Sequence, residues 1–258
     1  MIVAGVDVGS LTAKALLLDS ARLVLARRVV ATGARAAEAA QAAFAGALAD
    51  AGLTPADVVY VLATGYGRLR VPFAQAQVTE ITCHARGIAH WLPDARTLLD
   101  VGGQDSKAIR LGPGGQVQDF AMNDKCAAGT GRFLEVMARA LEVDVADLGD
   151  LAARARQAAQ ISSTCTVFAE SEVVGLVGAG RPPADIVAGL HAAIAERLLG
   201  LLHHVGVTPP LAMSGGVAYN AGVVRALEAK LGTPVLVPPE PQLVGALGAA
   251  LIALDRAG

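Results

Sequence analysis

The sequence predicts an α/β fold built from two similar lobes. Apolar segments of strand length alternate with helical segments along the chain, as in α/β proteins. An eight-residue motif that starts at Asp7 recurs at Asp100, each time between two apolar strands, and this internal repeat indicates a duplication. A further glycine turn, Ser214-Gly215-Gly216, follows a later apolar strand. These observations place polar and glycine residues at strand ends in both halves of the chain.

Each element of this fold is expected from the pattern of apolar residues. Short apolar runs bounded by turn residues predict strands at 2–6, 15–18, 58–63, 97–100, 211–213 and 234–237. Longer alanine- and leucine-rich runs predict helices at 36–51, 130–141, 168–177, 184–205, a segment ending near 231, and 243–254. We expect an N-terminal lobe over residues 1–95, joined by the C-terminal helix 243–258, and a C-terminal lobe over 96–242.

The composition argues against a nucleic-acid-binding or membrane protein. The chain has 258 residues and a net charge of −2, without a cluster of lysines or arginines, so we expect no nucleic-acid partner. The longest purely apolar run, 243–254, covers about 12 residues, whereas a membrane-spanning helix needs about 20. The N-terminus lacks the basic region of a signal peptide. We therefore expect a soluble cytoplasmic protein without a membrane association.

The repeated motif has the chemistry of a phosphate-binding loop. Aspartate, valine, glycine and lysine stand at the same offsets in residues 7–14 and 100–107. Glycines let backbone N–H groups approach phosphate oxygens, while hydroxyl groups and a lysine add further donors. The residues expected to act in this way are Gly9, Ser10, Thr12, Lys14, Gly102 and Gly103. The chain has no G-x-x-x-x-G-K-[ST] motif, so it is not a P-loop protein.

Three further polar positions complete the expected ATPase site. Asp7 and Asp100 end their strands and can hold a hydrated magnesium ion. Gln104 follows the second loop, where its amide can orient an attacking water molecule. The Gly215-Gly216 turn allows a strand-to-helix connection to lie flat against an adenine or a ribose. The sequence therefore predicts ATP hydrolysis through positioning and charge stabilisation.

Two of the three cysteines stand before predicted helices. No C-x-x-C spacing occurs, which excludes a zinc ribbon or ferredoxin-type site within one chain. Cys126 precedes the helix at 130–141 and Cys165 precedes the helix at 168–177, where a helix N-terminus stabilises thiolates and an anionic cluster. An iron–sulfur cluster normally takes four cysteines, and a two-fold dimer supplies four from two. We expect Cys83 to be a structural or weakly functional thiol rather than a cluster ligand.

These motifs resemble one family in particular, the ATP-dependent activators of 2-hydroxyacyl-CoA dehydratases. These proteins, also called component A or archerases, belong to the benzoyl-CoA reductase type ATPase group of the actin and sugar-kinase superfamily. The stretches that carry the resemblance are 7–10, 63–68, 100–105, 123–134, 161–172 and 245–251. They span nearly the whole chain, and the two cysteine motifs are the most specific.

The resemblance implies a duplicated two-lobe actin-like, ribonuclease H-like ATPase fold with the nucleotide cleft between the lobes. It also implies a homodimer with one 4Fe–4S cluster held by Cys126 and Cys165 of both subunits. Such activators take an electron from ferredoxin or flavodoxin and, driven by ATP, deliver it at low potential to a separate dehydratase. Nucleotide contacts are implied at Ser10, Leu11, Thr12, Ala13, Lys14, Gln104 and Gln242. Tyr219 replaces an expected glutamine, and Leu11 replaces a small hydroxyl residue.

Three other interpretations fit parts of the sequence. A small-molecule kinase of the same superfamily explains the two loops but not the paired cysteines. An ATP-binding subunit of a benzoyl-CoA reductase type complex shares the motifs, although the segments at 102–105 and 123–126 favour a free activator. A non-catalytic ATP-binding scaffold would not need both Asp7 and Asp100. We expect His84 to be a surface or helix-capping residue.

Overall fold

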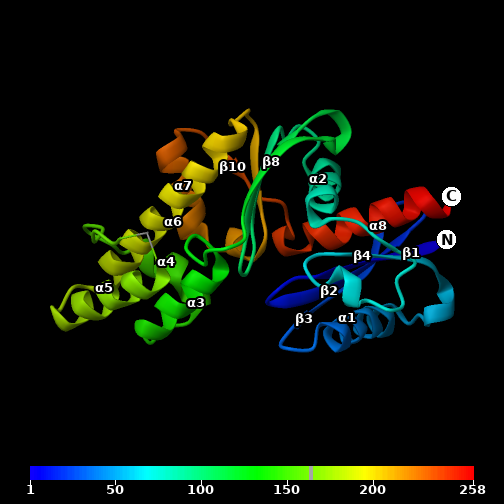
Figure 1. Cartoon of the computed structure of the whole chain (residues 1–258), viewed down its shortest axis with the longest axis horizontal. Coiled ribbons are helices and arrows are strands. Elements are labelled where there is room, and N and C mark those ends of the chain that lie inside the picture. The colour runs from blue at the N-terminus through cyan, green and yellow to red at the C-terminus, as the bar shows by residue number, and fades with distance from the viewer. Residues whose placement is uncertain (163–164) are drawn as a thin grey trace. The chain divides into compact units, whose positions relative to one another are not determined.

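The computed structural model describes residues 1–162 and 165–258 and divides into two compact units (Figure 1). Unit 1 consists of residues 1–95, 111–118 and 238–258. Unit 2 consists of residues 96–110 and 119–237. Both units are therefore assembled from segments that are separated in the sequence.

Unit 1 is a five-stranded sheet with helices on both faces (Figure 1). Its strands lie in the order β3-β2-β1-β4-β5 and comprise β1 (Ile2–Val8), β2 (Thr12–Asp19), β3 (Val24–Ala31), β4 (Val58–Thr64) and β5 (Ala76–Gln77). Its helices are α1 (Ala36–Ala51), α2 (Glu80–Trp91) and α8 (Val244–Ala257). The central strand β1 is buried on both faces: Val6 packs in the cluster with α1, and Val3 packs in the cluster with α8.

Helices α2 and α8 touch through their backbones. A Cβ atom built on Gly248 would lie 1.7 Å from the carbonyl oxygen of Cys83, and one built on Gly87 would lie 2.1 Å from that of Val244. No larger residue fits at such a crossing without moving a helix. The glycines of the segment at 245–251 therefore hold α8 against α2 and the sheet.

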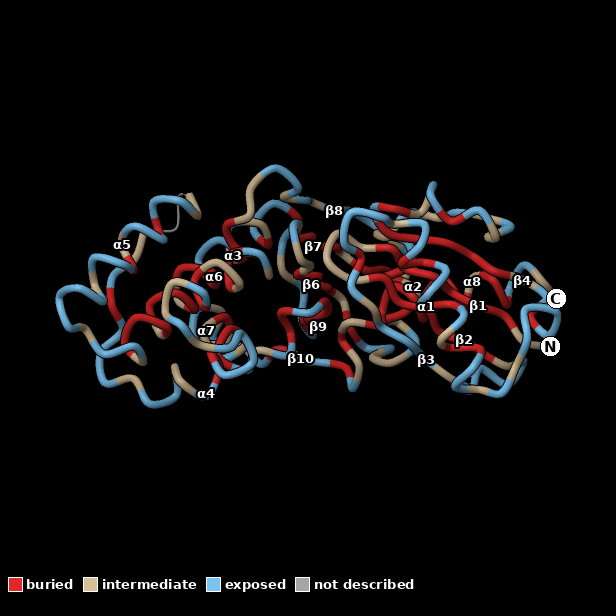
Figure 2. The backbone as a smooth tube through the Cα atoms, turned by 90° about the horizontal axis from the view of Figure 1, so that it is seen from below, coloured by how far each residue is buried: buried red, intermediate tan, exposed pale blue. Residues whose placement is uncertain are grey.

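Unit 2 repeats the plan of unit 1 with more helices. Its sheet has the order β8-β7-β6-β9-β10, with strands β6 (Thr97–Val101), β7 (Ser106–Leu111), β8 (Val117–Asn123), β9 (Leu211–Ser214) and β10 (Val235–Leu236). Its helices are α3 (Gly131–Ala140), α4 (Leu148–Ala152), α5 (Thr166–Gly178), α6 (Pro183–Val205) and α7 (Ala221–Leu231). Figure 2 shows that the central strands of the sheets are largely buried.

The two sheets have the same connectivity. In each sheet the first two strands form an antiparallel hairpin, the third strand lies beside the second, and the fourth lies parallel to the first. The duplication predicted from the repeated motif is thus present in the strand order as well as in the sequence.

Helix α6 is the one helix among the described residues that is long and apolar enough to cross a membrane. More than half of its most apolar window is buried inside the structure, and Leu190, Ile194 and Leu198 lie in the core of unit 2. This degree of burial is typical of a core helix.

Candidate functional site

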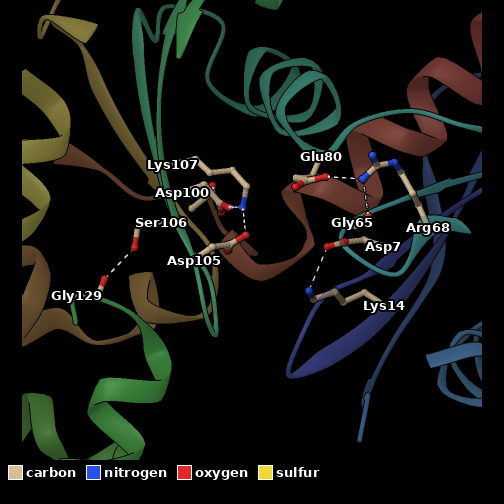
Figure 3. A network of polar contacts seen from close by, with 11 residues as sticks. Asp7, Lys14, Gly65, Arg68, Glu80, Asp100, Asp105, Ser106, Lys107 and Gly129 are labelled. Atoms are coloured by element: carbon tan, nitrogen blue, oxygen red, sulfur yellow. Dashed lines mark hydrogen bonds and ion pairs between the residues drawn. The ribbon is translucent and has the colours of Figure 1, made fainter. Parts of the chain in front are cut away.

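The first repeated motif forms a tight loop at the end of β1. Asp7 lies opposite Lys14 in the antiparallel register, and the backbone N–H of Gly9 donates to the carbonyl oxygen of Thr12 at 3.0 Å. The Lys14 ammonium donates to the Asp7 carboxylate at 3.1 Å, with both side chains buried (Figure 3). A buried carboxylate is stabilised by such a partner because burial removes it from water.

The second motif has the same geometry in unit 2. Asp100 lies opposite Lys107, and the N–H of Gly102 donates to the carbonyl oxygen of Asp105 at 2.9 Å. The Lys107 ammonium lies 3.5 Å from the Asp100 carboxylate and 2.9 Å from that of Asp105 (Figure 3). The two loops are therefore equivalent in register, loop closure and buried ion pair.

A glycine turn from the neighbouring parallel strand lies beside each aspartate. Gly65 follows β4 with a φ of +88°, and Gly215 follows β9 with a φ of +87°. A Cβ atom on Gly65 would lie 2.4 Å from the Asp7 carboxylate, and one on Gly215 would lie 3.0 Å from the Asp100 carboxylate. Glycine is required at both turns because of the backbone conformation and the lack of space.

The sequence did not lead us to expect the Gly65 turn beside Asp7. A signal for it was present, since both turns follow a hydroxyl residue that ends a strand parallel to an aspartate strand, Thr64 in unit 1 and Ser214 in unit 2. The Ser214 hydroxyl donates to the Asp100 carboxylate at 2.9 Å. The Thr64 hydroxyl is buried and makes no hydrogen bond to Asp7 within the described part of the chain, and its polar neighbour is the Cys83 thiol.

The other predicted nucleotide-contact residues lie in or beside these loops. In unit 1, Ser10, Leu11 and Thr12 are partly exposed, and the Gln242 amide donates to the Thr12 hydroxyl at 3.2 Å. In unit 2, Gln104 is exposed at the tip of the second loop. The remaining predicted contacts are Gly9, Ala13 and Lys14 in the first loop, Gly102 and Gly103 in the second, and Gly215 and Gly216 after β9.

The expectation that His84 lies at the surface is wrong. Its side chain is buried on α2, and its Nε2 lies 2.7 Å from the position of a Cβ on Gly245. The Asp7 carboxylate lies 3.1 Å from the same position. His84 is thus packed with Asp7 against the start of α8, which the local sequence around His84 does not reveal.

The cysteines differ in exposure. Cys165 is the N-cap residue of α5, and Cys126 lies in the loop before the N-cap of α3, Thr130. Both thiols are free and partly exposed, and α3 packs against α5. Ser163 and Thr164, which precede Cys165 in the sequence, lie outside the described residues.

Two partly exposed thiols fit half of a four-cysteine ligand set. Within the described residues no group of three or more potential metal ligands occurs, so one chain does not complete a site there. Cys83 is fully buried in α2, and burial raises the pKa of its thiol to about 12. It remains a protonated thiol at neutral pH, which makes it a poor metal ligand.

Hydrogen bonds join the loop of the second repeated motif to the segment that carries Cys126. The carbonyl oxygen of Gly102 accepts from the N–H of Gly131 at 2.9 Å, and that of Gly103 accepts from the N–H of Arg132 at 2.8 Å. The Ser106 hydroxyl donates to the carbonyl oxygen of Gly129 at 2.9 Å (Figure 3). The first turn of α3 is thereby fixed to the loop that follows Asp100.

Comparisons with known proteins agree with this arrangement. Residues 4–253 match the model of the BadF/BadG/BcrA/BcrD ATPase family. The activator of lactoyl-CoA dehydratase from Anaerotignum propionicum is 48% identical over 257 residues, which cover 100% of this chain and 99% of that protein.

Two solved structures are similar over the whole chain. Component A of (R)-2-hydroxyglutaryl-CoA dehydratase from Acidaminococcus fermentans is 43% identical, has a TM-score of 0.96, and matches over 100% of this chain and 99% of its own. The activator of the 2-hydroxyisocaproyl-CoA dehydratase from Clostridium difficile, solved with bound ADPNP, is also 43% identical, with a TM-score of 0.95 and coverages of 100% and 96%. These similarities confirm the predicted fold class.

Proposed function

Because the chain belongs to the BadF/BadG/BcrA/BcrD ATPase family, we propose that it is an ATPase that activates a 2-hydroxyacyl-CoA dehydratase by electron transfer. The observation that carries this proposal is the set of hydrogen bonds between the second phosphate loop and the first turn of α3. These bonds provide a physical link between a nucleotide site and a cysteine site within unit 2.

ATP is bound through the two phosphate loops in this proposal. Gly9 and Gly102 begin the turns whose backbone approaches the phosphates, and Lys14 contributes a cation. Asp7 and Asp100 hold the magnesium ion, which neutralises charge on the phosphates when bound. Gln104, exposed at the tip of its loop, orients the attacking water molecule. The two equivalent aspartate–lysine pairs support this assignment, since each places a lysine cation against a carboxylate inside the fold.

The cysteines are proposed to bind one 4Fe–4S cluster in a homodimer. Cys126 and Cys165 supply two ligands, and the same residues of a second copy supply the other two. Val167 and Phe168, two and three residues after Cys165, are 65% and 66% exposed, so apolar surface near the thiol is available to a second copy. The cluster would accept an electron from ferredoxin or flavodoxin and donate it to the dehydratase.

Nucleotide state reaches the cysteines through α3 in this proposal. A change in the backbone of Gly102 or Gly103 changes the acceptors of the Gly131 and Arg132 N–H groups. A ligand shifts such an arrangement only when it binds one state more tightly than the other, and the phosphate chain length provides that difference.

The named relatives favour this activity over the kinase and the reductase subunit. Three free cysteines agree with a reducing cytoplasm, which we propose as the location.

The proposal is tested by anaerobic purification followed by iron and sulfide assays. We expect about four iron atoms per dimer, and almost none in Cys126→Ala or Cys165→Ala. Cys83→Ala is the matched control and should keep its iron because this thiol is buried and protonated. Iron retained in both ligand variants, or lost in the control, would contradict the ligand assignment.

A further inference from the structure

Arg68 connects the Gly65 turn to the start of α2. It is the first residue of the short 3-10 helix Arg68–Arg70, which follows that turn. Its guanidinium donates to the carbonyl oxygen of Gly65 at 3.1 Å and to the Glu80 carboxylate at 3.2 Å (Figure 3). One side chain thus fixes both the turn and the first turn of a helix 12 residues further along the chain.

The turn that Arg68 fixes lies directly on the end of β1. The N–H of Gly67 donates to the carbonyl oxygen of Val8 at 2.8 Å, and a Cβ on Gly67 would lie 2.6 Å from the Val8 side chain. Gly65 is in similarly close contact with the Asp7 carboxylate. A displacement of this turn would therefore move the backbone against which the Asp7 carboxylate packs.

Among the described residues of unit 1, no hydroxyl group donates a hydrogen bond to the Asp7 carboxylate. In unit 2 the equivalent strand-end residue, Ser214, donates to Asp100, whereas the Thr64 hydroxyl makes no hydrogen bond to Asp7. The Arg68–Glu80 pair is only partly exposed, 30% and 17% for the two side chains. A charge-assisted pair at this degree of burial is stronger and more rigid than one at the open surface.

We propose that Arg68, held by Glu80, is a positioning residue that sets the Asp7 carboxylate for a divalent cation bound to nucleotide phosphates. This inference rests on the proposed function, because it takes Asp7 as a magnesium-holding residue. It assigns a role to the segment at 63–68, whose glycines and arginine have no part in the phosphate loops themselves. Arg68 acts through the turn and does not need to touch the nucleotide.

The test measures ADP binding by calorimetry, with and without Mg²⁺, for the full chain. In Arg68→Gln the Kd for ADP with Mg²⁺ should rise about tenfold, because a misplaced ligand weakens a geometry-dependent site. The Kd for ADP without Mg²⁺ should change by less than about twofold, since the phosphate loop itself is intact. Arg70→Gln is the matched control, because Arg70 is exposed in the same short helix.

Two further variants separate positioning from folding. Arg68→Lys keeps the charge and should recover part of the Mg²⁺-dependent affinity even if Arg68→Gln is less stable. Arg68→Gln combined with Glu80→Gln should be no weaker than Arg68→Gln alone, because the pair acts as one unit. Equal losses with and without Mg²⁺, no loss, or additive losses would overturn the inference. Failure of the unmodified protein to bind ADP at all would instead overturn the proposed function.

Discussion

Units 1 and 2 share one strand order but stabilise their equivalent aspartates differently. In unit 2 a hydroxyl from the neighbouring strand contacts Asp100 directly, and Lys107 is shared with Asp105. In unit 1, Asp7 is the one ion-pair partner of Lys14 among the described residues. The adjacent Gly65 turn is held by a hydrogen bond from Arg68. The two loops thus have the same backbone geometry, whereas the side chains around them differ.

The packing of helices on the two sheets differs as well. In unit 1, α2 and α8 meet through glycines, and the carbonyl oxygen of Cys83 occupies the space that a side chain at Gly248 would need. In unit 2, the side chains of Phe133, Leu134 and Met137 on α3 are buried in one hydrophobic cluster with residues of the sheet and of α6. Unit 1 therefore depends on close backbone approach, and unit 2 depends on side-chain volume.

The largest expected effect tests whether the two aspartates are functionally equivalent. Asp7→Asn and Asp100→Asn should each lower ATP hydrolysis about 100-fold or more, because each removes a charge that would hold the metal–phosphate complex. Steady-state phosphate release measures this loss. Asp119→Asn, on strand β8 beside Arg110, is the control and should retain activity. Full activity in either loop variant would show that the duplication is structural only.

A smaller effect separates the two strand-end hydroxyls. Ser214→Ala should lower the free energy of unfolding by about 2 kcal/mol, because Asp100 loses a buried hydrogen-bond donor. Thr64→Val should change it by less than about 1 kcal/mol, since the Thr64 hydroxyl makes no hydrogen bond to Asp7 and its polar neighbour is the weakly polar Cys83 thiol. Urea unfolding measures both values. Equal losses would mean that the two units support their aspartates alike.

The smallest effect concerns the pH dependence of stability. Burial, together with nearby Arg225, lowers the pKa of His191 to about 4, and its Nε2 lies 3.2 Å from the Asn220 amide. The unfolded chain binds a proton at this histidine below about pH 6.5, whereas the folded chain does not. Stability should therefore fall by about 1 kcal/mol between about pH 7.5 and about pH 5.5.

His191, to which we assign this loss of stability, lies in unit 2, and its substitution should remove the loss. His191→Gln should flatten the stability curve in that window, as measured by hydrogen exchange of peptides from α6. An unchanged slope would assign the pH dependence to another group. The corresponding buried group in unit 1, Cys83, acts in the opposite direction: its raised pKa means that stability is lost above about pH 9, where the unfolded thiol ionises.

Local sequence signals predicted the elements whose determinants lie within them. Helix α1 ends at Gly52, which has a φ of +66°, because the glycine that terminates the helix is the next residue in the chain. Strands β3 and β8 were not predicted. They lie at sheet edges, where the exposed apolar residues Leu25 and Phe120 interrupt the expected alternation of apolar and polar residues.

Local sequence signals did not predict contacts between residues that are far apart in the sequence. The repeated motif predicted both loops because each loop closes within eight residues. The Arg68–Glu80 pair was not predicted, because it depends on where α2 begins relative to the turn. His84 was expected at the surface because the helix that covers it, α8, comes about 160 residues later in the chain.

The position of α8 also determines the order in which the units become complete during synthesis. Strands β1 and β2 leave the ribosome before unit 2, but the helix that covers one face of their sheet is translated only after all of unit 2. Until then Val3, Leu16 and Leu62 lack their α8 partners. Unit 2, whose last residue is Val237, has its whole sequence available earlier. Strands translated before unit 2 therefore belong to the unit that is completed after it.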